Sequence, residues 1–438
     1  MFTYYLQLGL RSLKRNPVLT TLMILTLAIG VAASVSTLTI LHMMGSDPIP
    51  QKSQRLFYPG LDNQEKEGYQ PGKKPYDHQL TWQDTQNLLR APIGVHKVGL
   101  YGIRASVESS RPDLGSFSES GVATNRDFFA AFDTPFLYGQ AWQDAQDQNA
   151  SDVVVLNKDL AEKLFGKTSP VGKTLRMFEH DFTIVGVLND WQTRPRFHSY
   201  NGRSMALTTK EAFFIPLNTA SRHEITHNGG MSCHGPKVEA GWQGRLKSEC
   251  TWLHFWFELN DASERQQLQT YLDNYIKEQG KLGRYQRQLP AQLYNVKEFL
   301  IERKLIGDDS RLSAWLAFGF LLLCLVNTVG ILLAKFSVRA AEVGVRRALG
   351  ASKAQVFLQF IIESAVVGLV GAFLGLLLTL GALALLALRS QAIAAVAHLD
   401  WKMVGAAILL SIISAVLAGL LPTWRACQVT PAWQLKAQ

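Results

Sequence analysis

The chain has 438 residues, of which 47% are hydrophobic and 18% charged, with a formal net charge of +9. Four apolar blocks, residues 18–44, 312–334, 356–388 and 403–421, hold almost no charge, whereas residues 45–311 are polar and domain-sized. Each block meets or approaches the roughly 20 residues that cross a bilayer as a helix. This segregation excludes a wholly soluble protein. It predicts a membrane protein with four transmembrane α-helices and a large α+β extracytoplasmic domain between helices one and two.

The excess of basic residues lies at the ends of the apolar blocks, and residues 45–311 contain equal numbers of acidic and basic side chains. Loops rich in Lys and Arg stay on the cytoplasmic side of a membrane. The termini, residues 1–17 and 422–438, and the loop 335–355 are therefore predicted to be cytoplasmic. Residues 45–311 and the short loop 389–402 are predicted to lie outside. Charges scattered along membrane flanks favour no nucleic-acid partner.

The N-terminal segment has the features of a retained membrane anchor. Apolar residues recur at helical spacing in residues 2–15, with Arg11, Lys14 and Arg15 on the other side, which predicts an amphipathic helix against membrane lipid. Asn16-Pro17 is expected to end this helix. The apolar block that follows is longer than the hydrophobic region of a cleaved signal peptide, so we expect it to be retained.

Residues 45–311 alternate strand and helix signals, which predicts a sheet with helices packed on it in two subdomains. Thr81, with Asp84 three residues later, and Asn157 are residue types that begin helices by accepting hydrogen bonds from the first turn. Residues 252–259 alternate in a period of two that predicts a half-buried strand. The other predicted elements are strands at residues 56–58, 95–108, 117–123, 152–156, 174–178, 182–188 and 213–217, and helices at residues 82–89, 125–132, 158–165 and 263–278.

Two of the four cysteines, Cys233 and Cys250, fall in the predicted extracytoplasmic domain, where the compartment permits disulfides. We expect a bridge that closes a short polar loop, a constraint worth roughly 3 kcal/mol. Histidines gather near these cysteines, so a zinc site is the alternative. Their spacing matches no closed tetrahedral site, and we expect no bound metal. The histidines are His223, His227, His234 and His254.

Residues 166–174, Gly-Lys-Thr-Ser-Pro-Val-Gly-Lys-Thr, look like a phosphate-binding loop. That motif has four residues between its glycines, whereas five separate Gly166 from Gly172, and one of them is the rigid Pro170. We therefore expect a turn between a helix and a hairpin, and no cofactor on this chain. The sequence contains no Ser/His/Asp set or carboxylate pair whose spacing favours catalysis, so we do not expect an enzyme.

The third apolar block carries small residues at intervals of three and four, which let helices approach closely. They serve either packing within one subunit or contact between two copies of the chain, and the sequence favours neither. Asn327 and Thr328 in the second block predict a hydrogen bond between helices. The small residues are Ser364, Gly368, Gly371, Ala372 and Gly375.

Residues 342–351, Glu-Val-Gly-Val-Arg-Arg-Ala-Leu-Gly-Ala, lie between the second and third apolar blocks and predict a short cationic helix. Glu342 and Arg346 are four residues apart and can pair along one face, and Gly350 suits the end of a helix. The simpler interpretation is a solvated loop beside the membrane. That interpretation accounts for the charge and not for the helical pattern, so a contact surface for a cytoplasmic partner is favoured.

Two sets of residues resemble one known family, the FtsX-type permeases of MacB-like ABC transporters. The first set, residues 342–352, 359–364 and 368–375, is similar to the C-terminal membrane part of that family. The second set is similar to the family's periplasmic core domain and comprises residues 121–129, 153–157, 164–166, 170–173 and 182–187.

The resemblance implies a multi-pass protein of the bacterial inner membrane, whose periplasmic domain has a split porter part and an inserted lobe. It also implies ABC ATPase subunits that carry ATP and Mg, a second permease copy or a related permease, and possible contact with a periplasmic adaptor. We expect the ATPase on a separate chain. The helix that seats in the ATPase would use Glu342, Val343, Gly344, Arg346, Arg347, Leu349, Gly350 and Ala351.

ATP hydrolysis would then move the spans and the periplasmic domain, and drive export or mechanical work without substrate necessarily crossing through this chain. Two alternatives stay open: a lipoprotein-release permease, which should show a hydrophobic pocket or hook in the insert, and a non-transporting regulator of a periplasmic enzyme. A membrane-tethered enzyme is a remote third. Residues 220–252 depart from the family pattern, so neither substrate nor outer partner follows from the resemblance.

Overall fold

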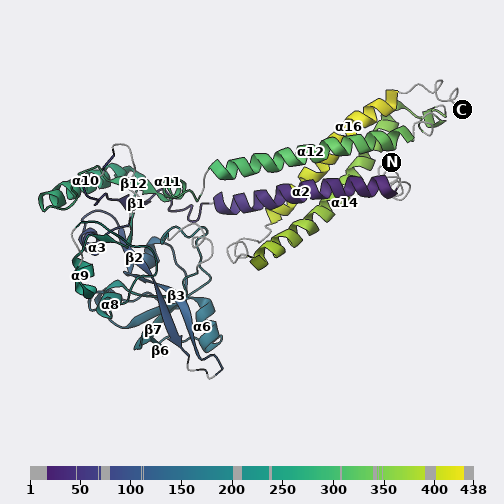
Figure 1. The fold of residues 1–438 in the computed structure, drawn as a ribbon. Helices are drawn as coiled ribbons and strands as arrows, with labels where there is room; N and C mark the ends of the chain where they lie inside the picture. Colours follow the sequence, from purple (N-terminus) through teal and green to yellow (C-terminus); the bar gives the residue numbers. More distant parts are fainter. Residues whose placement is uncertain are drawn as a thin grey trace. The chain divides into compact units, whose positions relative to one another are not determined.

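The computed structural model divides the chain into a helical unit, residues 1–45 and 307–438, and an α/β unit, residues 46–306 (Figure 1). The division falls where the sequence changes from apolar blocks to alternating patterns. The amphipathic helix predicted at residues 2–15 lies outside the described residues. The structure describes residues 17–45, 47–67, 69–70, 79–109, 111, 113–200, 210–235, 239–305, 308–338, 343, 345–347, 349–389 and 401–428.

Long apolar helices make up the described part of the helical unit. Helix α2 begins at Pro17. Proline has no backbone N–H, and at the first position of a helix an N–H would have no partner within the helix, so proline costs no hydrogen bond there. Three stretches are long and apolar enough to cross a membrane, namely Pro17–Leu38, Trp315–Lys335 and Lys353–Leu385, whereas the described apolar stretch Ile408–Trp424 is shorter. The helices are α2 (Pro17–Gly45), α12 (Asp308–Val338), α14 (Lys353–Arg389) and α16 (Trp401–Gln428).

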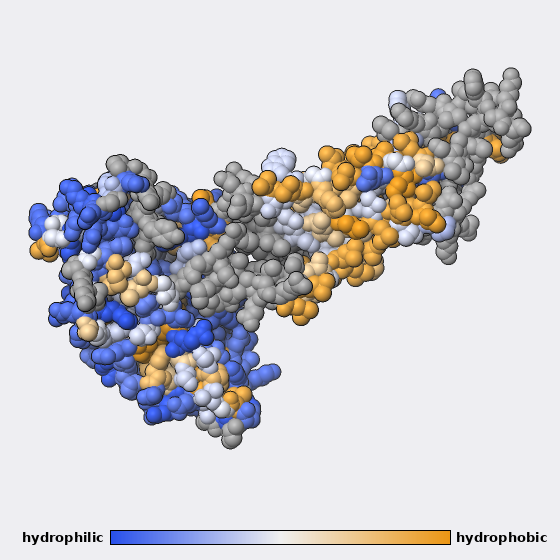
Figure 2. All heavy atoms as spheres, viewed as in Figure 1, coloured by the Kyte–Doolittle hydropathy of each residue, from blue (hydrophilic) through white to orange (hydrophobic). Residues whose placement is uncertain are grey.

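Helices α2 and α16 each pack against both α12 and α14, which places α12 and α14 diagonally opposite each other in the bundle (Figure 1). Met23, Leu332, Phe360 and Ala415, one from each helix, are buried in one apolar cluster between them. Large apolar side chains face outward along the same helices (Figure 2). An apolar exterior around an apolar core is the arrangement that suits lipid.

The hydrogen bond predicted between helices at Thr328 is wrong. The Thr328 hydroxyl donates to the Cys324 carbonyl at 2.8 Å, one turn back in its own helix, and Asn327 is exposed. A threonine inside a helix can bond its hydroxyl to the carbonyl four residues earlier, which has a second lone pair, so no second helix is needed.

The α/β unit is built on one ten-stranded sheet and a separate two-stranded pair, β9 (Ser232–Cys233) with β10 (Cys250–Thr251). The order along the large sheet is β12-β1-β11-β2-β3-β8-β5-β7-β4, with β6 pairing both β2 and β7. Its strands are β1 (Leu56–Gly60), β2 (His96–Glu108), β3 (Ser116–Thr124), β4 (Phe136–Gly139), β5 (Val153–Leu156), β6 (Thr174–Met177), β7 (His180–Leu188), β8 (Phe213–Pro216), β11 (His254–Glu258) and β12 (Gln292–Asn295).

Six of these strands close into a ring, because β6 links β7 back to the far end of the long strand β2. The pairs β3–β8 and β5–β7 are parallel, and the other pairs around the ring are antiparallel. Ile103, Val154, Phe182 and Ile215 come from four of the ring strands and share one buried core. Helix α6 (Lys158–Phe165) contributes its apolar side to the same core.

Beyond β2 the same sheet continues into strands from both ends of the unit. Strand β1 near its start pairs with β11 and β12 near its end. Helices α3 (Trp82–Leu89) and α10 (Arg265–Lys281) bury Leu88, Leu268 and Leu272 against Phe255 and Phe257 of β11. The middle of the insert therefore forms the ring, and its two ends are brought together beside it.

Strand β11 is buried on both faces, so the predicted half-buried strand is wrong. Phe255 and Phe257 face the core under α10, while Trp256 on the other face lies in a cluster with Phe128 of α4 (Asp127–Ala131) and Phe299 of α11 (Val296–Glu302). The polar members of the alternation are held by specific partners rather than by solvent. Glu258, for example, pairs with Lys52 and Arg55.

Local signals placed several elements correctly. Thr81 accepts the Asp84 N–H at 3.0 Å at the start of α3, and Asn157 accepts the Leu160 N–H at 2.8 Å at the start of α6. The hairpin β6–β7 turns at Phe178 and Glu179, both at positive φ. The remaining elements are α5 (Asp144–Gln148), α8 (Leu217–Arg222), α9 (Gly241–Lys247) and the 3-10 turn η1 (Ala262–Glu264).

Candidate functional site

The segment between α12 and α14 contains a short helical turn at Val345–Arg347 that closes on a glycine. The Ala351 N–H donates to the Arg346 carbonyl and the Gly350 N–H to the Arg347 carbonyl. Gly350 has φ +99°, a left-handed conformation that ends helices and favours glycine. Ser352 and Gln355 then cap each other's backbone N–H groups at the start of α14. The chain therefore stops one helix and starts the next within a few residues.

The two sides of this turn differ in burial. Val343 is 5% exposed and lies in the apolar cluster of the bundle with Met23 and Phe360. Val345 and Leu349, four residues apart on a helical turn, are 53% and 84% exposed. One side chain thus anchors the segment in the bundle, while an adjacent apolar pair is presented outward beside basic residues.

Arg346 contacts the bundle rather than only the solvent. Its guanidinium donates to the Gln359 side chain of α14 at 2.8 Å. Arg347 is half-buried. The predicted partner Glu342 and the predicted site residue Gly344 lie outside the described residues, so the pairing of Glu342 with Arg346 stays a prediction.

The small residues of α14 face other helices of the same chain. A Cβ at Gly368 would lie 2.6 Å from the Ala415 Cβ of α16, and one at Gly375 would lie 3.1 Å from the Ala28 carbonyl oxygen of α2. Gly371 faces Leu27 of α2 in the same way, and Ser364 and Ala372 are buried. These residues therefore allow close packing within one subunit.

A buried ion pair in the helical unit was not singled out from the sequence. The Lys335 Nζ of α12 lies 2.8 Å from the Glu363 Oε1 of α14, and the two side chains are 0% and 3% exposed. In the sequence Glu363 lies within residues 359–364, one of the stretches that carry the family resemblance, and no partner was predicted for it. The available signal was a carboxylate inside an apolar block, because an intramembrane charge is costly unless it has a partner.

Cys233 and Cys250 form a disulfide that joins β9 to β10. The predicted histidine group is dispersed: His254 is buried between Tyr58 and Gln79, whereas His223 contacts Asp152 at 2.7 Å. Burial lowers the pKa of His254 well below its ordinary value. Among the described residues, no three His, Cys, Asp or Glu side chains gather in a metal-binding arrangement.

Residues 166–174 form the connection between α6 and β6. Gly166 and Gly172 both have positive φ, and the Gly172 N–H donates to the Ile184 carbonyl of β7. A phosphate loop keeps its backbone N–H groups for the nucleotide, whereas this one is used within the sheet. The segment is a turn, as its spacing predicted.

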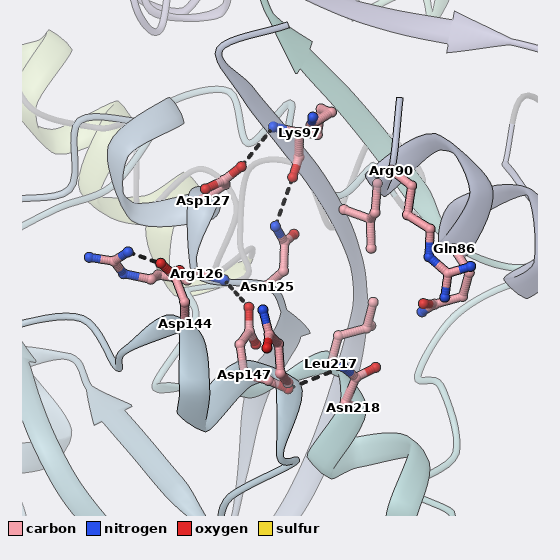
Figure 3. A pocket seen from close by; sticks show the side chains of 12 residues that line it. Gln86, Arg90, Lys97, Asn125, Arg126, Asp127, Asp144, Asp147, Leu217 and Asn218 are labelled. Carbon is pink, nitrogen blue, oxygen red and sulfur yellow. Dashed lines mark hydrogen bonds and ion pairs between the residues drawn. The ribbon is translucent and has the colours of Figure 1, made fainter. Parts of the chain in front are cut away.

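A hollow of about 400 Å³ opens on the α/β unit where α3, α5 and α8 meet (Figure 3). Its acidic side chains have partners nearby: Asp144 pairs with the Arg126 guanidinium at 2.9 Å, and Asp127 accepts the backbone N–H of Lys97 at 3.0 Å. Asp147 accepts the Arg126 N–H at 2.9 Å. The apolar residues among those that line it are Leu89 and Leu217 and the other ten are polar, so this hollow is not the apolar pocket that an acyl chain would need.

The chain is similar to two families along most of its length. Residues 20–275 match the MacB-like periplasmic core domain, and residues 314–431 match the FtsX-like permease C-terminal family. The first match covers more than half of the chain, and the two occur in the order predicted from the motifs.

Several curated relatives share this arrangement. The chain is 24% identical to the pyoverdine export ATP-binding/permease protein PvdT of Pseudomonas syringae, over 94% of this chain and 56% of that protein. It is 23% identical to the uncharacterized ABC transporter permease YknZ of Bacillus subtilis, over 68% of this chain and 65% of that protein. A macrolide export ATP-binding/permease protein MacB of Bdellovibrio bacteriovorus is 23% identical over 56% of this chain and 33% of its own length.

The chain thus spans between 33% and 65% of the length of these relatives. Among solved structures, the periplasmic region of MacB from Actinobacillus actinomycetemcomitans aligns with 57% of this chain at 13% identity and a TM-score of 0.35, which is too low to carry an argument. The family matches do carry one. The chain belongs to the FtsX-type, MacB-like permeases of ABC transporters.

Proposed function

We propose that this permease works in the bacterial inner membrane as the subunit that converts ATP hydrolysis on partner ABC ATPase subunits into movement of its periplasmic domain. The movement drives export, or efflux, by mechanotransmission. The observation that carries the proposal is the asymmetric turn between α12 and α14, with Val343 held in the bundle and Val345 and Leu349 presented outward. Such an apolar pair beside basic residues suits a groove in a soluble partner.

The distribution of charge supports the orientation that this function needs. Basic residues flank the apolar blocks on the side of the turn, and residues 45–311 have equal numbers of acidic and basic residues. In the proposed topology α16 is the fourth span, both termini are cytoplasmic, and residues 46–306 are periplasmic. The disulfide in that unit is consistent with an oxidising compartment.

Export is favoured over lipoprotein release by two observations. Two of the relatives are named as exporters, PvdT of pyoverdine and MacB of macrolides. The hollow on the α/β unit is lined by ten polar residues and by Leu89 and Leu217, a lining that suits an acyl chain poorly. In the proposed assembly, two permeases, identical or related, pair with two ATPases that hold ATP and Mg, and a periplasmic adaptor is a further partner.

The test is to replace Leu349, the most exposed apolar residue of the turn, by Glu. The tagged permease is purified with its ATPase from membranes of its own host and placed in lipid nanodiscs, and vanadate-sensitive ATP hydrolysis is measured. We expect Leu349→Glu to lower the amount of bound ATPase and the hydrolysis per permease at least tenfold, because a carboxylate would be buried without a partner in the groove.

Leu282→Glu is the matched control, since Leu282 is 72% exposed and lies in the α/β unit. It should leave both quantities within twofold of the unsubstituted protein. Arg346→Glu with Arg347→Glu should also abolish stimulation of the ATPase. Normal coupled hydrolysis in the Leu349→Glu permease would contradict the assignment of this turn as the coupling site.

A further inference from the structure

Helix α14 carries a row of polar side chains that bond to the helix start, to the coupling turn and to α12. Gln355, Gln359 and Glu363 are spaced four residues apart, so they lie one above another on the helix. Gln355 caps Ser352, Gln359 accepts from Arg346, and Glu363 pairs with Lys335. The row thus holds, in order, the helix start, the candidate coupling turn and the opposite helix α12.

The Lys335–Glu363 pair spans the diagonal of the bundle. Helices α12 and α14 both pack on α2 and α16, and the ion pair joins them at 2.8 Å through the core. The apolar residues Leu332 and Phe360, three positions before each partner, are buried in the same cluster. In such surroundings a single charge is strongly unfavourable, so each partner holds the other in place.

The position of the Lys335–Glu363 pair determines which helices it can move together. Lys335 lies three residues before the last residue of α12, Val338, and Glu363 lies in the third turn of α14. The coupling turn lies between these helices in the chain and is itself tied to α14 by Arg346 and Gln359. A force on the turn therefore reaches α14 through this contact, and the ion pair passes the movement of α14 on to α12.

We propose that Lys335 and Glu363 are positioning residues that form a strut across the bundle, so that α12 and α14 move as one body when the coupling turn is displaced. This inference rests on the proposed function of the turn and adds the route by which its movement reaches α12. Because α12 directly follows the α/β unit in sequence, the strut links the cytoplasmic contact to a helix that is connected with that unit.

The experiment measures the distance between the two helices in the full-length chain. Spin labels are attached at Ala334→Cys of α12 and Leu358→Cys of α14, both exposed positions, in a chain carrying Cys324→Ala and Cys427→Ser. The labelled protein is placed in nanodiscs of phosphatidylethanolamine and phosphatidylglycerol. The distance distribution is compared for the intact pair, Lys335→Met with Glu363→Met, and the exchanged pair Lys335→Glu with Glu363→Lys.

The apolar pair is expected to fold with an unchanged melting temperature, because replacing both members of a buried ion pair by apolar residues is often neutral. Its distance distribution should be at least twofold wider, and the exchanged pair should restore the narrow one. Thr379→Val is the control: Thr379 is buried in α14 but bonds only the Gly375 carbonyl of its own helix among the interactions the structure describes, so the distribution should not change. A narrow distribution in the folded apolar pair would overturn the strut.

A second measurement separates this inference from the proposed function. The labelled permease is purified with its ATPase, and the distance is measured with and without ATP and vanadate. With the intact pair the distance should stay the same on ATP trapping, because α12 and α14 move as one body, whereas with the apolar pair it should shift while ATP hydrolysis stays within twofold. If the distance shifts with neither pair on ATP trapping, the proposed function fails, while the strut is still judged by the widths measured without ATPase.

Discussion

The α/β unit holds the carboxyl group of Asp147 in surroundings that disfavour its charged form. It lies in the polar hollow between Asp127 and Asp144, and accepts the Arg126 N–H. Burial, offset in part by the N–H of Arg126, raises the pKa of Asp147 from 3.8 to about 6. The raised value means that the folded protein binds this proton more tightly than the unfolded chain does.

The sign of the effect on stability follows from linkage. Below the unfolded pKa the carboxyl is protonated in both states and carries no penalty, and the penalty grows as pH rises towards the folded value. Asp147→Asn should therefore increase the free energy of unfolding at pH 7.5 by about 1–2 kcal/mol after allowing for partial exposure, and raise the melting temperature accordingly. The gain should shrink as pH falls to about 4, when calorimetry of the full-length chain is repeated; a pH-independent gain would show that the charge is not responsible.

Glu211 lies in the opposite electrostatic situation. Burial alone would raise its pKa, but the charges of His198 and Arg196, in contact at 2.9 and 3.0 Å, lower the pKa to about 2. All three side chains are buried. The lowered pKa of Glu211 contributes stability that is fully present above the unfolded pKa of 4.5 and is lost as pH falls from there to about 2.

At the scale of elements, local patterns predicted more than pairings did. Thr81 and Asn157 predicted the starts of α3 and α6, because an N-cap side chain bonds a backbone N–H only three residues further along the chain. The ring of strands depends on Val107 of β2 meeting Met177 of β6, a contact between segments 70 residues apart for which no local signal exists. The burial of both faces of β11 escaped prediction for the same reason: what covers a strand is decided by distant segments.

In the candidate site, too, local features could be predicted from the sequence and contacts between helices could not. The position of Val345–Arg347 and its end at Gly350 could be read from the sequence, since helix ends have local chemistry. The contact of Arg346 with Gln359 and the pair Lys335–Glu363 could not, because they depend on how two helices are packed.

The contact between α14 and α16 should be sensitive to side-chain volume at Gly368. A leucine there would meet Ala415 and the Ser411 carbonyl, so Gly368→Leu should destabilise the helical unit by about 1–3 kcal/mol. Gly381→Leu in the same helix is the control, since nothing lies within 4 Å of its Cβ position. Thermal unfolding in detergent, followed by circular dichroism, should separate the two variants; equal melting temperatures would contradict the packing.

At the scale of the whole molecule, the proposed orientation places the α/β unit and the coupling turn on opposite sides of one membrane. Single cysteines at Leu282 and Leu349, both strongly exposed, can report this in a chain carrying Cys324→Ala and Cys427→Ser. In intact spheroplasts an impermeant maleimide should label Leu282→Cys and leave Leu349→Cys unlabelled until the membrane is opened. Labelling of both positions before opening would rule out the proposed topology.

The pairing of β1 with β12 determines when the sheet of the α/β unit can be completed during synthesis. β1 ends at Gly60, and its partner begins at Gln292, so more than half of the chain is synthesised between the two. At bacterial rates that interval lasts roughly 10–50 s. During it the free edges of β1 are open to other strands, a condition that invites aggregation. The sheet of the α/β unit is complete only when β12, which ends at Asn295, has left the ribosome. Until then strand β1 depends on protection from other strands.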